Sequence, residues 1–194
     1  MKRALSCFVP VLLLCFVFTS VALAGELEDG LFKAGISGDL DAARALIKKG
    51  ADVNAVNSGG DRPIFQAAML GQTDFARLLI ESGADINARN KDGDTPLMAA
   101  VISGVKDVAL VLIEKGADVN ARDNSGGTAI LYAASMANVD VVKALIDKGA
   151  DVTVKTDGGA TALGNAQDAG LDEMDSTRKA RREEIIRMLK AAGA

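Results

Sequence analysis

Apolar residues recur along this chain at an interval of 33 residues. Each recurring segment begins with an aspartate, carries a Leu–Ile pair near its middle and ends in glycine. This pattern predicts amphipathic helices in which the aspartate accepts hydrogen bonds from free N–H groups of the first turn. The glycine is suited to the left-handed turn that ends a helix. The segments are DAARALIKKG at 41–50, DFARLLIESG at 74–83, DVALVLIEKG at 107–116 and DVVKALIDKG at 140–149.

A shorter apolar segment precedes each of the predicted helices at 74–83, 107–116 and 140–149. Another such segment follows the helix at 140–149. Thr95, Thr128 and Thr161 are candidate N-caps of these shorter helices, and Pro63 and Pro96 suit a first helical turn. Their alanines allow neighbouring helices to approach closely. The segments are RPIFQAAMLG at 62–71, TPLMAAVISG at 95–104, TAILYAASMA at 128–137 and TALGNAQDAG at 161–170.

Turn-rich stretches connect one pair of predicted helices to the next. Each stretch starts with a variant of the same six residues, and projecting hairpins are expected there. A unit of hairpin, helix, turn and helix cannot bury its apolar face alone, so the units must stack into a solenoid. The six-residue starts are GADVNA at 50–55, GADINA at 83–88, GADVNA at 116–121 and GADVTV at 149–154.

The repeated unit resembles the ankyrin repeat family, whose pattern runs roughly G-x-TPLH-x-AA-x-x-G-x-x-x-V-V-x-x-L-L-x-x-GADVNA. Residues 92–121, DGDTPLMAAVISGVKDVALVLIEKGADVNA, match it at nearly every framework position. The resemblance implies an all-α fold, an α-solenoid of about five helix-turn-helix repeats with projecting β-hairpin loops. The expected repeats are 26–57, 58–90, 91–123, 124–156 and 157–194, the last with an 11-residue insert near 171–183.

The histidine of the family's TPLH motif is absent from every copy. Apolar residues replace it in four copies, so we expect this position to be packed without a hydrogen bond. The replacements are Phe32, Phe65, Met98, Leu131 and Gly164.

The first 24 residues have the three-part pattern of a secretory signal peptide. A positive start at 1–3 precedes an apolar run at 7–18, and Ala22-Leu23-Ala24 fits a cleavage site before Gly25. An uncleaved membrane anchor is the alternative. We therefore expect one domain at 25–194 that acts in the periplasm, with secretion as the alternative. Both cysteines lie within the signal, so the mature domain must be held by a packed core.

Charge and residue types argue against several classes of function. Without Lys2 and Arg3, 20 of the 22 basic residues remain against 26 acidic residues, which disfavours nucleic acid as a partner. The chain has no histidine, the usual catalytic base. The acidic run DEMD at 172–175 lacks the spacing of a calcium loop. We predict a protein that is not an enzyme and that binds neither a metal nor a cofactor.

The ankyrin resemblance implies a concave binding groove between the first helices and the hairpin tips. Exposure is expected for Met69, Tyr132 and Met136, whereas Leu70 and Ile102 could equally pack between repeats. Exposed methionine adapts to irregular partner surfaces, and tyrosine and arginine are frequent interface anchors. The candidate residues on the first helices are Gln66, Met69, Leu70, Ile102, Ser103, Tyr132, Ser135 and Met136. Those on the hairpins are Val56, Ser58, Asp61, Arg89, Lys91, Asp92, Asp94, Arg122, Asn124 and Lys155, whose cations would make one hairpin edge basic.

A second candidate contact lies in the basic part of the insert, at Arg178, Lys179, Arg181 and Arg182. The alternative is that these residues form the charged outer face of a capping helix, which solenoid ends require. The i,i+4 pair Glu183 and Arg187 favours a lengthened terminal helix.

The sequence thus predicts a monomeric, non-catalytic protein-interaction module outside the cytoplasm, with no membrane contact after signal cleavage. Its partner would be another protein: an exported enzyme that it supports, a toxin that it blocks, or a host target of a secreted effector. Binding of a small ligand or glycan in the groove, with Tyr132 as a stacking surface, is the alternative.

Overall fold

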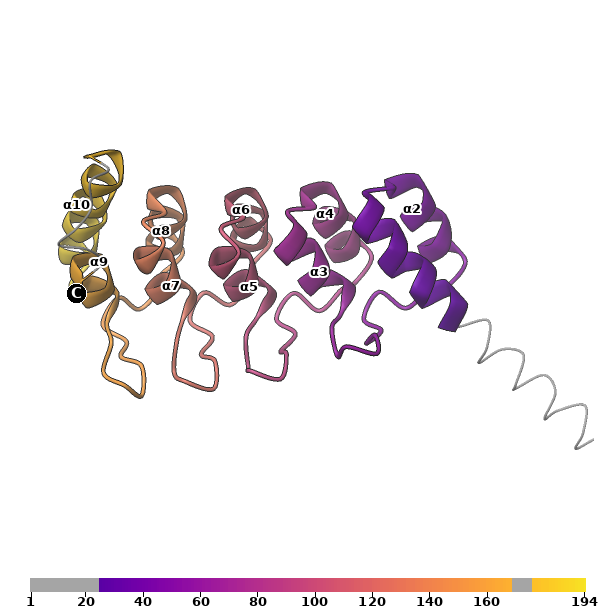
Figure 1. Cartoon of the computed structure of the whole chain (residues 1–194), viewed down its shortest axis with the longest axis horizontal. Coiled ribbons are helices and arrows are strands. Elements are labelled where there is room, and N and C mark those ends of the chain that lie inside the picture. The colour runs from indigo at the N-terminus through magenta and orange to yellow at the C-terminus, as the bar shows by residue number, and fades with distance from the viewer. Residues whose placement is uncertain (1–24, 169–175) are drawn as a thin grey trace, which may run out of the picture.

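The described residues of the computed structural model, 25–168 and 176–194, form helix pairs that stand side by side in one elongated row (Figure 1). The signal peptide predicted over 1–24 and residues 169–175, which include the start of the predicted insert, lie outside this described part. Loops project from one edge of the row between successive pairs (Figure 1). The predicted all-α solenoid is confirmed.

Each pair consists of consecutive helices joined by a short turn. A helix over 25–37 pairs with α2 (Leu40–Lys48). The following pairs are α3 (Pro63–Leu70) with α4 (Thr73–Glu81), α5 (Pro96–Ile102) with α6 (Lys106–Glu114), α7 (Ala129–Ser135) with α8 (Val139–Asp147), and α9 (Ala162–Asp168) with α10 (Ser176–Ala191). First helices pack on first helices and second helices on second helices, as the contacts of α5 with α7 and of α6 with α8 show.

The second helices begin earlier than the sequence predicted. Asp41, Asp74, Asp107 and Asp140 occupy the second position of their helices and do not cap them. In α2 and α8 the cap is formed two residues earlier: Asp39 accepts a hydrogen bond from Ala42 N at 2.9 Å, and Asn138 accepts one from Val141 N at 3.3 Å. Gln72 and Val105 occupy the same position before α4 and α6 without a side-chain cap bond. The prediction that the four aspartates are caps was therefore wrong. Their charges still favour the helix starts, because a helix N-terminus is positive.

The predicted threonine caps are confirmed in two of three positions. Thr95 accepts a hydrogen bond from Met98 N at 3.3 Å, and Thr161 accepts one from Gly164 N at 3.0 Å. Thr128 occupies the cap position but makes no such bond. Its φ of −130° is more extended than the −95° of Thr95, so the hydroxyl is placed differently relative to the first turn.

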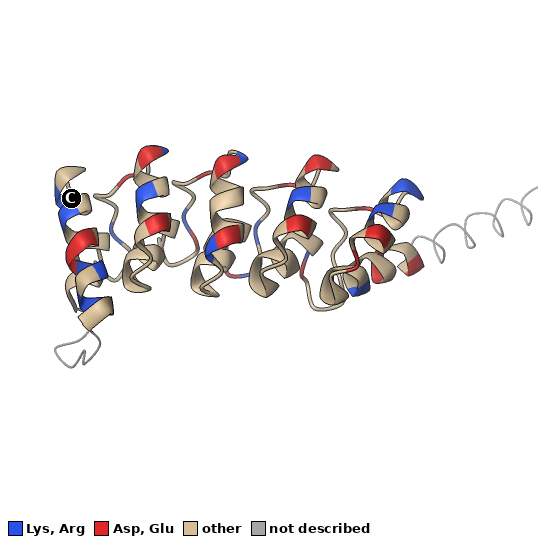
Figure 2. Ribbon diagram, turned by 90° about the horizontal axis from the view of Figure 1, so that it is seen from above, with Lys and Arg blue, Asp and Glu red and all other residues tan. Residues whose placement is uncertain are grey.

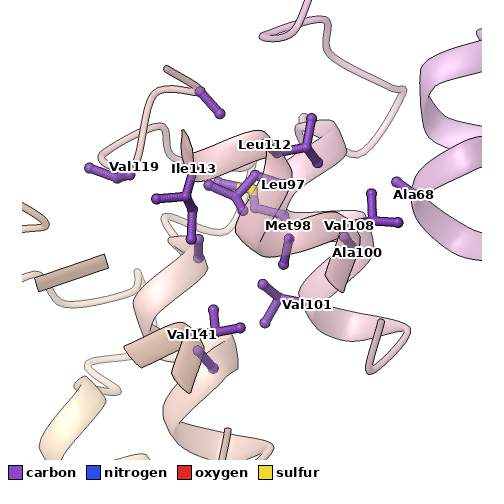
Figure 3. Packing of buried hydrophobic residues seen from close by; sticks show 14 of the residues in the cluster. Ala68, Leu97, Met98, Ala100, Val101, Val108, Leu112, Ile113, Val119 and Val141 are labelled. Carbon is purple, nitrogen blue, oxygen red and sulfur yellow. The ribbon is translucent and has the colours of Figure 1, made fainter. Parts of the chain in front are cut away.

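One apolar core runs the length of the row between the helices. Phe32, Phe65, Met98 and Leu131 are all buried, which confirms that the TPLH histidine position is packed by apolar side chains. Gly164 is half-buried. Figure 3 shows Leu97, Met98 and Leu112 together at the interface of α5 and α6. The fully buried alanines Ala67, Ala68, Ala100, Ala133 and Ala134 allow adjacent first helices to approach closely.

Acidic and basic residues alternate along the face seen in Figure 2. Two ion pairs join neighbouring second helices, Arg77 with Glu114 at 3.7 Å and Lys106 with Asp140 at 2.9 Å. Within residues 25–168 and 176–194, no helix is both long and apolar enough to cross a membrane.

Candidate functional site

The asparagine of GADVNA links each unit to the next. Asn54 donates from Nδ2 to the carbonyl of Gly83 at 3.1 Å and accepts at Oδ1 from Asp85 N at 2.8 Å. Asn87 accepts from Asp118 N at 2.8 Å, and Asn120 repeats both bonds with Gly149 and Asp151 at 3.1 and 2.7 Å. We call this series the asparagine ladder. The six-residue segment recurs at a constant spacing because its asparagine must reach the same backbone groups of the next unit each time.

The ladder has a different residue at each end. At the start, Glu28 Oε1 accepts from Asp52 N at 2.9 Å, so a carboxylate of the first helix takes the place of an asparagine. At the far end, Thr153 replaces asparagine and bonds to Asp151 of its own unit, at 2.9 Å from its N–H and 2.7 Å from its hydroxyl.

The loop tips are closed by a repeated turn and joined to one another. The N–H groups of Asn57, Asn90, Asp123 and Thr156 each donate to the carbonyl four residues later, at 2.9 to 3.0 Å. Between tips, Asn124 N donates to Asp92 O at 3.0 Å and Asp157 N to Ser125 O at 2.9 Å. The β pairing expected of hairpins is limited, across the described loops, to one isolated bridge between Lys155 and Thr161.

The basic residues predicted on the hairpins are exposed, but three of them also tie loops together. The guanidinium of Arg89 donates to the carbonyl of Arg122, and that of Arg122 donates to the carbonyl of Lys155 at 2.8 Å. Lys91 Nζ donates to Gly59 O at 3.4 Å. Arg89, Lys91 and Arg122 therefore also help to hold neighbouring hairpins in register.

Large exposed apolar side chains gather on the last turns of the first helices. Ile36, Met69 and Ile102 are 61 %, 56 % and 42 % exposed and lie 33 residues apart. Leu70 and Met136, at the next position, are 53 % and 46 % exposed. We call these five residues the apolar stripe. Leu70 and Ile102 are both exposed, and their role in binding a partner stays a prediction. Ile36 was missed by the sequence reasoning, although its position 33 residues before Met69 could have identified it.

An open hollow of about 430 Å³ adjoins the stripe at Ile102. We call it the acidic hollow, because three aspartates contribute to its lining. It lies between the last turn of α5, the start of α7 and two successive loop tips. Its lining residues are Asp92, Asp94, Ile102, Asp123, Asn124, Ser125 and Tyr132.

A tyrosine–aspartate pair forms one wall of the acidic hollow. The Tyr132 hydroxyl donates to Asp123 Oδ2, while Oδ1 accepts from Ser125 N at 2.7 Å and Gly127 N at 2.9 Å. Gly127 leaves room for the pair, because a Cβ there would lie 2.5 Å from both Asp123 Oδ2 and Tyr132 Oη. Tyr132 is half-buried as a result, which corrects the expectation of an exposed ring.

The pKa values of Tyr132 and Asp123 are shifted in opposite directions. Burial, and then the hydrogen bond to Asp123, raise the pKa of Tyr132 to about 12. Burial alone would raise the pKa of Asp123, but hydrogen bonds from Tyr132, Ser125 and Gly127 outweigh it and hold that pKa below its ordinary value. At neutral pH the hollow therefore carries an ionised aspartate and a neutral tyrosine.

The remaining groove candidates differ in exposure. Val56 is 55 % exposed, and Ser58, Asp61, Asp92, Ser103 and Asn124 are also exposed. Gln66, Asp94 and Ser135 are half-buried. Asn124 donates from Nδ2 to the carbonyl of Lys91 at 3.1 Å, so it too connects neighbouring loops.

The basic candidates of the insert separate into two kinds. Arg178, Lys179 and Arg181 are exposed on α10, which is 16 residues long and confirms the lengthened terminal helix. Arg182 is only 6 % exposed, and its guanidinium donates to the carbonyls of Asn165 and Ser135, both at 3.4 Å. The placement of Arg182 on the outer surface was therefore wrong, because the helix turns this side chain into the preceding pair.

The described residues contain no group of three or more histidine, cysteine, aspartate or glutamate side chains that could hold a metal ion.

Comparison with known families gives one assignment. A family model described as ankyrin repeats (3 copies) matches residues 31–123 and 84–156, which together span more than half of the chain. No curated protein matches the sequence. Ankyrin repeats are generally protein–protein interaction modules and are typically non-catalytic. The family match and the stacked helix pairs agree, and the chain belongs to the ankyrin repeat family.

Proposed function

We propose that this chain is a non-catalytic module that binds another protein through the apolar stripe and the acidic hollow. One observation carries the proposal. Of the six large apolar side chains exposed in the described residues, five form the stripe, and Val56 is the sixth. Contiguous exposed apolar patches on soluble proteins commonly mark interaction sites.

The hydrogen bonds between units support binding by a preformed surface. The asparagine ladder and the bonded loop tips fix each unit relative to its neighbour. A surface held in its binding shape loses little conformational entropy on association. Affinity would then depend on the side chains of the stripe and the hollow.

The proposal includes action outside the cytoplasm, supported by the leader pattern of residues 1–24. Within the periplasm, or after secretion, the partner would be an exported enzyme, a toxin or a host protein. Mass measurement of the protein from an extracytoplasmic fraction tests this part. A chain that begins at Gly25 supports export, whereas an intact leader on protein in the cytoplasm refutes it.

The binding proposal is tested by affinity capture from an extract of exported proteins. Three baits are compared: the natural chain, a stripe variant with Met69→Ser and Met136→Ser, and a control with Lys48→Ala and Lys115→Ala on exposed positions of the second-helix side. Circular dichroism establishes that all three are folded. A partner retained by the natural chain and the control but lost by the stripe variant supports the proposal. Equal retention by all three would refute the assignment to the stripe.

A further inference from the structure

The spacing of the apolar stripe indicates the backbone conformation of its partner. Packed helices lie about 8–10 Å apart, so the stripe presents an apolar group about every 9 Å along the row. An α-helix returns to the same face after seven residues, or about 10.5 Å. An extended strand returns to the same face after about 7 Å, so its side chains fall out of step with the stripe. A helix laid along the row matches the stripe more closely.

Charge beside the stripe indicates which side chains flank that helix. The acidic hollow meets the stripe at Ile102 and has three aspartates and neither lysine nor arginine in its lining. Asp61, exposed 33 residues before Asp94, continues the acidic flank one unit earlier. The hairpin cations Arg89, Lys91 and Arg122 donate to backbone carbonyls of neighbouring loops.

The other end of the stripe has mixed charge. Met136 lines a second open hollow of about 600 Å³ together with Lys106, Asp140, Arg181 and Glu184. Lys106 and Asp140 are paired at 2.9 Å. We therefore expect the surface to favour cations of the partner near Ile102 and not near Met136. At Met136 the stripe meets α10.

We propose that the stripe and the acidic hollow together accept an amphipathic α-helix of the partner protein, with apolar residues facing the stripe and lysine or arginine along one edge facing Asp92 and Asp94. This inference rests on the proposed function and names the chemistry of the partner at the same surface. Recognition follows the general mode in which a helix lies in a groove and is anchored at i, i+3, i+4 and i+7.

Synthetic peptides test the inference directly. Three fluorescein-labelled peptides of about 18 residues, enough to span the stripe as a helix, share the same leucines at heptad positions. The first has lysines along one edge, the second has glutamates at those positions, and the third is the lysine peptide with two central prolines. Binding to the full chain is measured by fluorescence anisotropy at low and at high salt.

The lysine peptide is expected to bind about tenfold more tightly than the glutamate peptide, with a difference that shrinks as salt screens the charges. Asp92→Asn with Asp94→Asn should weaken binding of the lysine peptide about fivefold and leave the glutamate peptide unweakened. The matched control, Glu81→Gln with Asp147→Asn, removes the same charge from exposed positions of α4 and α8 and should change neither affinity.

Two results would overturn the inference: a glutamate peptide that binds as tightly as the lysine peptide, or a proline peptide that binds as tightly as its helical parent. Failure of all three peptides, while partner capture still depends on Met69 and Met136, would also overturn it and leave the proposed function standing. If capture is insensitive to the stripe as well, both fail.

Discussion

The hydrogen bond between Tyr132 and Asp123 predicts an unusual titration that can be isolated in this chain. Tyr132 is the only tyrosine, and tryptophan is absent. Tyrosinate absorbance therefore reports this one side chain. Asp123→Asn is the perturbation of choice, because an amide fits the space of the carboxylate and removes its charge.

The expected magnitude follows from the two contributions to the raised pKa. Burial remains in the variant, whereas the bond to a carboxylate and its charge are lost. The pKa of Tyr132 should therefore fall from about 12 toward its ordinary value in Asp123→Asn and remain raised by burial. Each pKa unit lost corresponds to about 1.4 kcal/mol, and with solvent screening of the half-buried ring we expect a loss on the order of 1 kcal/mol.

The sign of the pH dependence is fixed by the direction of each shift. Because the folded pKa of Tyr132 is raised, its contribution to stability is complete below the unfolded value of about 10 and is lost as pH rises through about 12. Because the pKa of Asp123 is lowered, its contribution is complete above its unfolded value and is lost as pH falls through the folded one. The natural chain should thus exceed the variant by about 1 kcal/mol at pH 7, and less at both extremes.

The assay is an absorbance titration with circular dichroism recorded on the same samples. Asp92→Asn, which changes an exposed aspartate of the same hollow that makes no bond to the phenol, serves as control and should titrate like the natural chain. A tyrosine that titrates near 10 while the helices remain intact would refute the assigned hydrogen bond. So would an unchanged midpoint in Asp123→Asn.

Three further changes test the framework. Asn120→Ala removes both of its bonds to the next unit and should lower the free energy of unfolding in urea by about 1–2 kcal/mol; an unchanged midpoint would mean that the ladder does not stabilise the stack. Gly127→Ala places a Cβ against the tyrosine–aspartate pair and should cost about 1–3 kcal/mol, while Gly158→Ala, whose Cβ meets nothing nearer than 3.7 Å, should cost less than about 1 kcal/mol; equal losses would contradict the close approach. Arg182→Ala should speed amide hydrogen exchange in α10 and cost about 1–3 kcal/mol, whereas the exposed Arg181→Ala should stay within about 0.5 kcal/mol; matching exchange in both variants would argue against the buried contacts.

Features tied to the 33-residue period could be predicted from sequence, and features that depend on a single local geometry could not. The helix pairs, the packed position of Phe65 and Met98, and the exposure of Met69 all follow from register. The bond between Tyr132 and Asp123 depends on how one loop tip folds over one helix start, and no other copy has both residues. Helix starts were misplaced by two residues, because an aspartate inside the first turn is favoured by the helix dipole and resembles a cap in sequence.

Arg182 shows a different limit of sequence reasoning. It lies within the 11-residue insert, where the period no longer indicates which face a residue occupies. A run of four cations within five residues is usually solvated, yet the helix places one of them against the carbonyls of Ser135 and Asn165.

The replacement of asparagine by Thr153 bears on the order in which the chain opens. Arrays of stacked units are stabilised by nearest-neighbour contacts, so each missing contact creates a seam. Because Thr153 bonds within its own unit, α9 and α10 dock without the ladder that fastens the interior units. Native-state fluctuations should then release α9 and α10 as one cooperative segment, while interior amides exchange only when the whole stack unravels. The absence of a ladder contact after Thr153 would thereby make α9 and α10 the first part of this domain to open.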